Sequence, residues 1–196
     1  SARTAGLTCR AREVVMRLAI LVSGSGRTLQ NLIDRIADGS LKASIEIVIG
    51  SREGLEAKSR ARSASIDFEI IEQKSFGSID EFSNRIFDRC DRSKVDLVCL
   101  AGWLCRLKIP KRYENRVINI HPSLLPKFGG IGMFGRKVHE AVLKSGETES
   151  GCTVHFVDDE YDAGPIVLQR KCPALPDDTA ETLAERVFVE ECVAYP

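Results

Sequence analysis

The chain has 196 residues, of which 28 are basic and 28 are acidic, so its formal net charge is zero. A length near 200 fits one domain, or two very small ones, and is long enough to bury a core. Balanced charge argues against a protein that grips a nucleic-acid backbone or an anionic membrane, and no apolar run approaches the ~20 residues that span a bilayer. The expected partner is a small molecule or a modest protein surface.

The start of the chain is rich in arginine and lacks the apolar core of a secretory signal. We interpret residues 1–16 as an extension outside the fold, with Met16 as a candidate natural start, and residues 17–196 as one domain.

Apolar runs alternate with helical periodicity in the first half of that domain. Short apolar runs predict buried strands at 18–22, 45–49, 68–71 and 95–101. Helices are predicted between them, at 28–39 with Thr28 as cap and Gly39 as terminator, at 55–65 and at 79–90. This order is typical of βαβ units with right-handed crossovers.

The second half is less regular. A strand at 117–121 is followed by a proline- and glycine-rich stretch and by a helix at 137–143, and β-rich runs at 152–157 and 166–172 flank a loop. A last helix begins near Thr179 and is expected to continue to Pro196. We predict an α/β fold of one domain, with an open, mostly parallel twisted sheet, helices on both faces and a Rossmann-type N-terminal half.

The cysteines are odd in number, have no CxxC spacing, and several lie in apolar runs. They favour buried free thiols in a reducing cytosol over disulfides or a zinc site.

The first candidate site is the loop of residues 23–28, SGSGRT, between the first strand and the first helix. Glycines and a helix N-terminus suit a phosphate, although the sequence is neither a Walker A loop nor a dinucleotide fingerprint. A tight turn without a ligand is the alternative. The G-x-G-x-x-G at 130–135 follows a proline-rich loop rather than a strand, so we interpret it as a chance match.

The second candidate site is the end of the strand at 117–121. Residues two apart share a face, so Asn119 and His121 point the same way, and Pro122 ends the strand beside them. Open α/β sheets bind ligands at this edge, where a histidine can transfer protons and an amide can stabilise an oxyanion. The alternative is a polar pair satisfied by neighbouring loops.

The third is the acidic loop at 158–165. Its spacing does not fit a calcium loop, whereas a single carboxylate from it can orient His121 and raise the pKa of that imidazole. Residues 158–160 otherwise read as a solvated turn. His155 is interpreted as a half-buried structural residue, and His139 as a surface residue of its helix.

Together, in this order and spacing, the three segments resemble the phosphoribosylglycinamide formyltransferase family of purine biosynthesis, over almost the whole chain from Arg17. The most specific motifs are NIHPSLLP at 119–126 and DAGP at 162–165, which mark folate-dependent formyltransferases more widely. The opening SGSG, followed by LQN at 29–31, points to the glycinamide ribonucleotide branch.

The resemblance implies a reaction in which the amine of glycinamide ribonucleotide attacks the formyl group of 10-formyltetrahydrofolate. Asn119 and protonated His121 would stabilise the oxyanion of the tetrahedral intermediate, and His121 would move a proton toward the departing folate nitrogen. Asp162 would hold the imidazole and favour its charged form. The co-substrate is the folate, and no metal is required.

The resemblance also assigns binding residues. The phosphate would sit on Gly26, Arg27 and Thr28, and Glu191 would meet the substrate amine. The implied folate-binding positions are Leu104, Cys105, Arg106, Leu107, Asn119, Asp158, Asp159, Glu160 and Tyr161. Family members usually have Asn at the position of Thr28 and often Ser at the position of Arg27. Some have a polar residue that contacts the substrate at the position of Phe188.

Two sibling enzymes and a binding module are the alternatives. Formyltetrahydrofolate deformylase uses a similar trio with water as acceptor, and normally has an N-terminal regulatory domain. Methionyl-tRNA formyltransferase would need a C-terminal domain and a basic face. A non-catalytic ligand-binding module would not need the trio. We expect small-molecule substrates, no nucleic-acid or membrane partner, a monomer or homodimer, and a cytoplasmic location.

Overall fold

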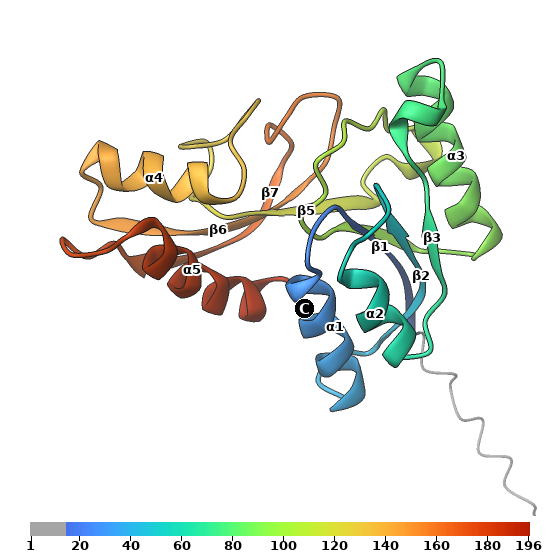
Figure 1. The fold of residues 1–196 in the computed structure, drawn as a ribbon, viewed down its shortest axis with the longest axis horizontal. Helices are drawn as coiled ribbons and strands as arrows, with labels where there is room; N and C mark the ends of the chain where they lie inside the picture. The colour runs from blue at the N-terminus through green and yellow to red at the C-terminus, as the bar shows by residue number, and fades with distance from the viewer. Residues whose placement is uncertain (1–14) are drawn as a thin grey trace, which may run out of the picture.

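The computed structural model describes residues 15–196, in which seven strands form one sheet in the order β3-β2-β1-β4-β5-β6-β7 (Figure 1). Strands β1 to β5 are parallel, and β6 and β7 pair antiparallel at one side. The open, mostly parallel sheet predicted from the sequence is confirmed. Residues 1–14 of the N-terminal extension lie outside the described part, whereas Met16, interpreted as belonging to that extension, is the first residue of β1 and pairs with Ala43.

The strands are β1 (Met16–Val22), β2 (Ala43–Gly50), β3 (Phe68–Ile70), β4 (Leu97–Leu100), β5 (Val117–His121), β6 (Glu149–Phe156) and β7 (Ile166–Pro173). The helices are α1 (Arg27–Ala37), α2 (Ala57–Ser63), α3 (Ile79–Arg92), α4 (Arg136–Ser145) and α5 (Ala180–Ala194). No helix in residues 15–196 is long and apolar enough to cross a membrane.

Most element boundaries shift by a few residues from the expected ones, and three elements are clearly shorter than expected. Helix α2 is shorter than 55–65 because Ser65 adopts a left-handed φ of 57° just after it. Strand β4 is shorter than 95–101, since the Val95 N–H bonds the Cys90 carbonyl in the turn that closes α3. Helix α5 ends at Ala194 and does not continue to Pro196.

The start of α1 also corrects a prediction. Gly26, not Thr28, is the N-cap, with a left-handed φ of 77° and no side-chain cap. A Cβ at Gly26 would lie 2.8 Å from the Cβ of Ala57, so the turn requires glycine both for its φ and for its close approach to α2. Arg27 and Thr28 are consequently the first two residues of the helix.

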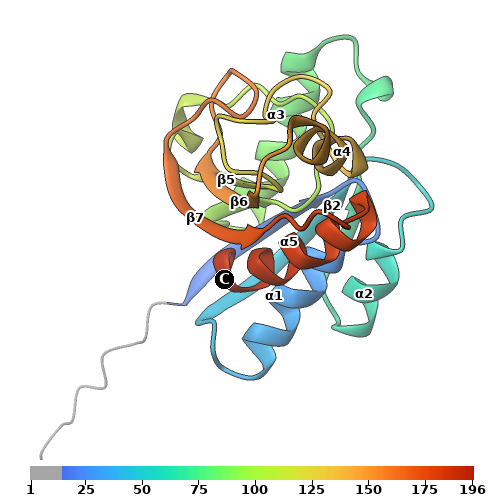
Figure 2. The ribbon, with the colours of Figure 1, turned by 90° about the vertical axis from the view of Figure 1, so that its left-hand side faces the viewer.

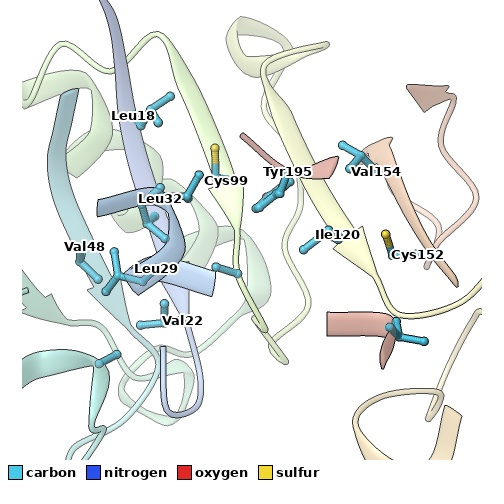
Figure 3. Close-up of a cluster of buried hydrophobic side chains, with 14 of the residues drawn as sticks. Leu18, Val22, Leu29, Leu32, Val48, Cys99, Ile120, Cys152, Val154 and Tyr195 are labelled. Atoms are coloured by element: carbon cyan, nitrogen blue, oxygen red, sulfur yellow. The ribbon is translucent and has the colours of Figure 1, made fainter. Parts of the chain in front are cut away.

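Apolar residues of β1 alternate between two cores. Leu18, Ile20 and Val22 pack with residues of α1, α2 and α5, whereas Ala19 and Leu21 pack with residues of α3. Figure 2 shows α1, α2 and α5 on one side of the sheet, and Figure 3 shows Leu29 and Leu32 of α1 against β1. Helix α4 packs against α5. Burial on both faces explains why β1 reads as a continuous apolar run.

The cysteines of the described part are free, and four of them are buried as the apolar runs predicted: Cys90, Cys99, Cys152 and Cys172. Burial raises the pKa of Cys90, Cys99 and Cys152 to about 12, which keeps these thiols protonated. Cys9 lies outside the described residues.

The sheet order places a topological switch point between β1 and β4. From β1 the chain moves outward through β2 to β3, and then returns to the other side of β1 with β4 and β5. The loops after β1, β4 and β5 therefore open at the same edge of the sheet, where such folds bind ligands.

Candidate active site

Three of the polar residues singled out in the sequence meet at this edge. Asn119 and His121 lie at the end of β5, and Asp162 comes from the loop between β6 and β7. The Nδ1 atom of His121 is 3.4 Å from Oδ2 of Asp162, and the His121 side chain is almost fully buried. The fold thus joins residues that are 41 positions apart in the sequence (162 minus 121).

The hydrogen bonds of His121 fix its tautomer. Its Nε2 lies 2.8 Å from the carbonyl oxygen of Phe128, which can only accept a hydrogen bond, so Nε2 carries the proton. In the neutral ring, Nδ1 is then the unprotonated atom, and it faces Asp162. A proton taken up by His121 goes to Nδ1, where the carboxylate stabilises the resulting charge.

Two opposing influences set the pKa of His121. Burial lowers the pKa, while the Asp162 carboxylate and the Phe128 carbonyl raise it, and the net pKa lies below its ordinary value. Asp162 raises the pKa of His121, as expected of a neighbouring carboxylate, but desolvation of the charged ring outweighs this effect and the net shift is downward. His121 is a base in its resting state.

Asp162 is held in an uncommon backbone conformation. Its φ is 54°, in the left-handed region that short polar residues tolerate better than bulky ones, and its Oδ2 accepts a 2.9 Å bond from the Gly130 N–H. Burial would raise the pKa of Asp162, but the two nearby imidazoles and the Gly130 N–H lower it overall. The carboxylate is consequently ionised beside His121.

The carboxamide of Asn119 has a partner that the sequence did not reveal. Strands β5 and β6 pair so that Asn119 is opposite His155, and Asn119 Nδ2 lies 3.1 Å from His155 Nε2. His155 is 2% exposed, and the same Nε2 is 3.5 Å from Oδ1 of Asp162. His155 is therefore fully buried within the site, not half-buried outside it.

The loop after β5 is secured by buried hydrogen bonds. Thr153 Oγ1 donates to the Ser123 carbonyl at 2.7 Å and accepts from the Leu125 N–H at 3.0 Å. Gln169 Nε2 donates to the Leu125 carbonyl and to Thr153 Oγ1, each at 2.9 Å. These bonds from β6 and β7 hold the loop in place. They thereby also position the Phe128 carbonyl, which accepts the hydrogen bond from His121.

The DAGP segment depends on its glycine. A Cβ added to Gly164 would lie 1.9 Å from the carbonyl oxygen of Phe156. That oxygen is 2.9 Å from Nδ1 of His155, and the Phe156 N–H bonds the Pro165 carbonyl at 2.9 Å. Only glycine lets the segment approach β6 this closely. This approach also positions Asp162, which precedes Gly164 by two residues.

The loop after β1 lies against the loop after β4. Ser23 N–H donates to the Gly102 carbonyl at 3.2 Å, and Ser23 Oγ accepts from the Leu104 N–H at 3.0 Å. The backbone N–H groups of Arg27 and Thr28, in the first turn of α1, have no carbonyl four residues earlier in the helix to bond. The geometry that suits a phosphate is present at this helix start.

Arg27 is engaged with α5. Its guanidinium bonds both carboxylate oxygens of Glu185, at 2.7 and 2.6 Å, and lies 3.9 Å from the centre of the Phe188 ring. The two departures from the family pattern, at positions 27 and 188, are thus in contact with each other. Glu191 lies one helical turn beyond Phe188 on the same helix, and burial raises its pKa to about 7.

A pocket adjoins the trio. Its walls come from the loop after β4, the end of β5, the end of β6 and the acidic loop. The lining residues are Leu100, Trp103, Cys105, Arg106, Leu107, Asn119, His155, Val157 and residues 158–162. Of the positions implied for folate binding, Leu104 alone does not line it, and its side chain is 54% exposed.

His139 corrects a further prediction. It is 4% exposed on α4, not a surface residue, and its Nδ1 has no hydrogen-bond partner among the described residues. Burial lowers its pKa, and a charge on His121 would lower it further. Residues 15–196 contain no cluster of three or more histidine, cysteine or acidic side chains that could hold a metal ion.

Known proteins resemble this chain over nearly its whole length. Residues 16–196 match the family described as formyl transferase. The phosphoribosylglycinamide formyltransferase of Haemophilus influenzae is 37% identical over 182 residues, covering 92% of this chain and 84% of that protein. A relative from Vigna unguiculata, described as chloroplastic, is 38% identical over 195 residues, covering 95% of this chain and 61% of that protein.

Longer proteins match as well. The trifunctional purine biosynthetic protein adenosine-3 of Drosophila pseudoobscura pseudoobscura is 40% identical over 199 residues, and the match covers 100% of this chain but only 14% of that protein. Among solved structures, glycinamide ribonucleotide transformylase 1 from Symbiobacterium toebii has a TM-score of 0.86 at 37% identity, covering 93% of this chain and 84% of that chain.

Proposed function

The chain belongs to the formyl transferase family, among the phosphoribosylglycinamide formyltransferases, and from this we propose that it transfers the formyl group of 10-formyltetrahydrofolate to the amine of 5'-phosphoribosylglycinamide. The observation that carries the proposal is the contact of His121 with Asp162, beside a pocket that Asp162 and Asn119 line. A histidine can transfer protons, a carboxylate can stabilise its charged form and an amide can stabilise an oxyanion, and formyl transfer between nitrogen atoms can use all three.

The resting protonation of His121 suggests the order of proton movements. The amine nitrogen attacks the formyl carbon, and the carbonyl electron pair moves to oxygen, which becomes an oxyanion. Neutral His121 accepts the proton that the attacking amine loses, at Nδ1, where Asp162 stabilises the charge. The Asn119 carboxamide and the charged imidazole stabilise the oxyanion. Collapse of the intermediate breaks the bond to the folate nitrogen, which takes the proton from His121.

The binding assignments follow from the surrounding loops. Backbone N–H groups at Gly26, Arg27 and Thr28 would hold the phosphate at the start of α1. Glu191, with a pKa near neutrality, would accept a hydrogen bond from the substrate amine. The pocket beside Asn119 would take the folate ring between its apolar wall and the acidic loop.

The wider assignments are also proposals. We infer one catalytic domain over residues 17–196 that acts on two small molecules, without a metal, as a monomer or homodimer. A cytoplasmic location and the lack of a nucleic-acid or membrane partner stay predictions from composition.

One assay tests the activity. The protein is mixed with 10-formyltetrahydrofolate, with and without glycinamide ribonucleotide, and release of free tetrahydrofolate is followed. We expect release only when the nucleotide is present. Release that ignores the nucleotide would replace the proposal with a deformylase, and tight folate binding without turnover in either mixture would replace it with a binding module.

A further inference from the structure

We propose that His155 is a positioning residue that fixes which end of the Asn119 carboxamide faces the reacting formyl oxygen. The inference rests on the proposed function, because it assigns a role within the same site. His155 touches Asn119 and Asp162 and lines the pocket beside them.

The position of His155 follows from strand pairing. The antiparallel register of β5 and β6 sets Asn119 directly opposite His155, and His121 opposite Thr153. Side chains that are opposite one another on antiparallel strands have Cβ atoms close enough to interact. His155 therefore meets Asn119 through the sheet itself, without depending on a loop.

The hydrogen bonds of His155 determine its tautomer. Nδ1 lies 2.9 Å from the Phe156 carbonyl, which only accepts, so Nδ1 carries the proton of the neutral ring. Nε2 is then an acceptor, and the group 3.1 Å away on Asn119 must be a donor. The carboxamide is thereby locked with its NH2 group toward His155.

The lock has a chemical consequence for Asn119. An NH2 group has two N–H bonds, of which His155 takes one and leaves the other for a second acceptor. If the carboxamide were reversed, its oxygen would take the position of the NH2 group and would repel an oxyanion at the place of the second acceptor. The Asn119 side chain makes no other hydrogen bond within the described residues, so nothing else there sets its orientation.

Asp162 is a second polar group near the same nitrogen of His155, and it competes with Asn119 for that nitrogen. Its Oδ1 is 3.5 Å from the Nε2 that accepts from Asn119, and its Oδ2 is 3.4 Å from Nδ1 of His121. A proton on His155 Nε2 would turn that atom into a donor toward Asp162 and would displace the Asn119 NH2 group. The neutral ring with its proton on Nδ1 satisfies the Phe156 carbonyl and the Asn119 NH2 group, and its unprotonated Nε2 makes no hydrogen bond to Asp162 in this form.

The first test compares two substitutions. His155→Gln places a side-chain carbonyl where Nε2 accepts, whereas His155→Leu fills space without an acceptor. We expect His155→Leu to lower kcat by about 10-fold or more with both KM values within about 3-fold of wild type, and His155→Gln to stay within about 3-fold in kcat. Equal losses in the two folded variants would overturn the proposal, since a purely structural role does not distinguish them.

The second test asks whether His155 acts through Asn119. Asn119→Ala should lower kcat by about 100-fold or more, as for other lost oxyanion donors. Adding His155→Leu to that variant should then lower kcat by less than about 2-fold, because the positioned group is already gone. A full multiplication of the two losses would show that His155 acts by another route.

A third measurement does not depend on turnover. In protein labelled with 15N, the imidazole nitrogens of His155 should show a protonated Nδ1 and a bare Nε2, and the Asn119 NH2 resonances should shift in His155→Leu more than in His155→Gln. The opposite tautomer would overturn the proposal even in an active enzyme. If the tautomer is as stated but no formyl group is transferred, the proposed function fails and the orientation of Asn119 stands.

Discussion

Burial lowers the pKa of His121, and the neighbouring Asp162 carboxylate raises it. Because the neutral ring is the base in the proposed reaction, kcat should fall as the pH drops through this lowered pKa, in a range below the ordinary value of 6.5. Removing the carboxylate takes away the main influence that raises the pKa.

Asp162→Asn should therefore move the acid limb of the kcat profile to lower pH and reduce the plateau by about 100-fold, since the charged imidazole loses its partner. The measurement is kcat against pH for both proteins, with circular dichroism as the control for folding. A limb that moves to higher pH would contradict the assignment of His121 as a neutral base.

Single residues also show what sequence reasoning can reach at this scale. Asn119 and His121 were found because residues two apart on a strand share a face, and because proline marks the strand end. His155 could not be assigned in the same way, since its role depends on the register of β6 against β5, which period-two alternation does not reveal. The polar Thr153 and His155, two residues apart and therefore on one face of β6, were the available signal.

At the scale of elements, the turn between β6 and β7 is the one most constrained by packing. Gly164 approaches the Phe156 carbonyl so closely that a Cβ would lie 1.9 Å from it. The turn must shift to accept any side chain, and Asp162 and the carbonyl that orients His155 would shift with it.

Gly164→Ala should accordingly lower the free energy of unfolding by about 1–3 kcal/mol and reduce kcat. The matched control is Gly77→Ala, where the nearest atom to an added Cβ is the Glu81 carboxylate oxygen at 3.4 Å and φ is not left-handed. Urea unfolding and kcat measure the two effects. Equal stability of the two variants would show that the turn relaxes freely.

Two predictions about helices, the cap of α1 and the exposure of His139, are wrong because contacts with other elements decide them. Thr28 has the residue type of a cap, but the left-handed turn at Gly26 starts the helix two residues earlier. His139 lies on a helix whose polar residues suggest solvent, yet α4 turns that position inward. Helix propensity and hydrophobic periodicity describe a segment on its own. Neither includes the packing against other elements that sets the helix start near Thr28 and the burial of His139.

At the scale of the molecule, the site is assembled from both halves of the chain. The parallel half supplies the loop proposed to bind phosphate and the ends of β4 and β5, and its βαβ organisation was predicted from the alternation of strands and helices. The antiparallel pair β6 and β7 supplies His155 and the loop carrying Asp162, and the sequence showed these runs without showing where they join the sheet. Helix α5 then returns across the sheet to contact α1, which brings Glu185 and Phe188 to Arg27.

The end of α5 is tied to the sheet by Tyr195. Its buried hydroxyl lies 2.9 Å from the Leu100 carbonyl and 3.2 Å from the Ile118 carbonyl, so it bridges β4 and β5 just before Asn119. Tyr195→Phe keeps the ring, which packs in the core shown in Figure 3, and removes only the hydroxyl. The variant should lose about 1–2 kcal/mol of unfolding free energy, because a buried hydrogen bond disappears without opening a large cavity.

The matched control is Tyr161→Phe, whose ring is 45% exposed and whose loss should stay below about 0.5 kcal/mol. Urea unfolding of both variants and of the wild type gives the comparison. If the two substitutions cost the same, the Tyr195 hydroxyl does not hold α5 to the sheet. If only Tyr195→Phe is destabilised, the last helix and the strand that ends at His121 are coupled through one hydroxyl group, and the stability of the candidate site depends on the C-terminal end of the fold.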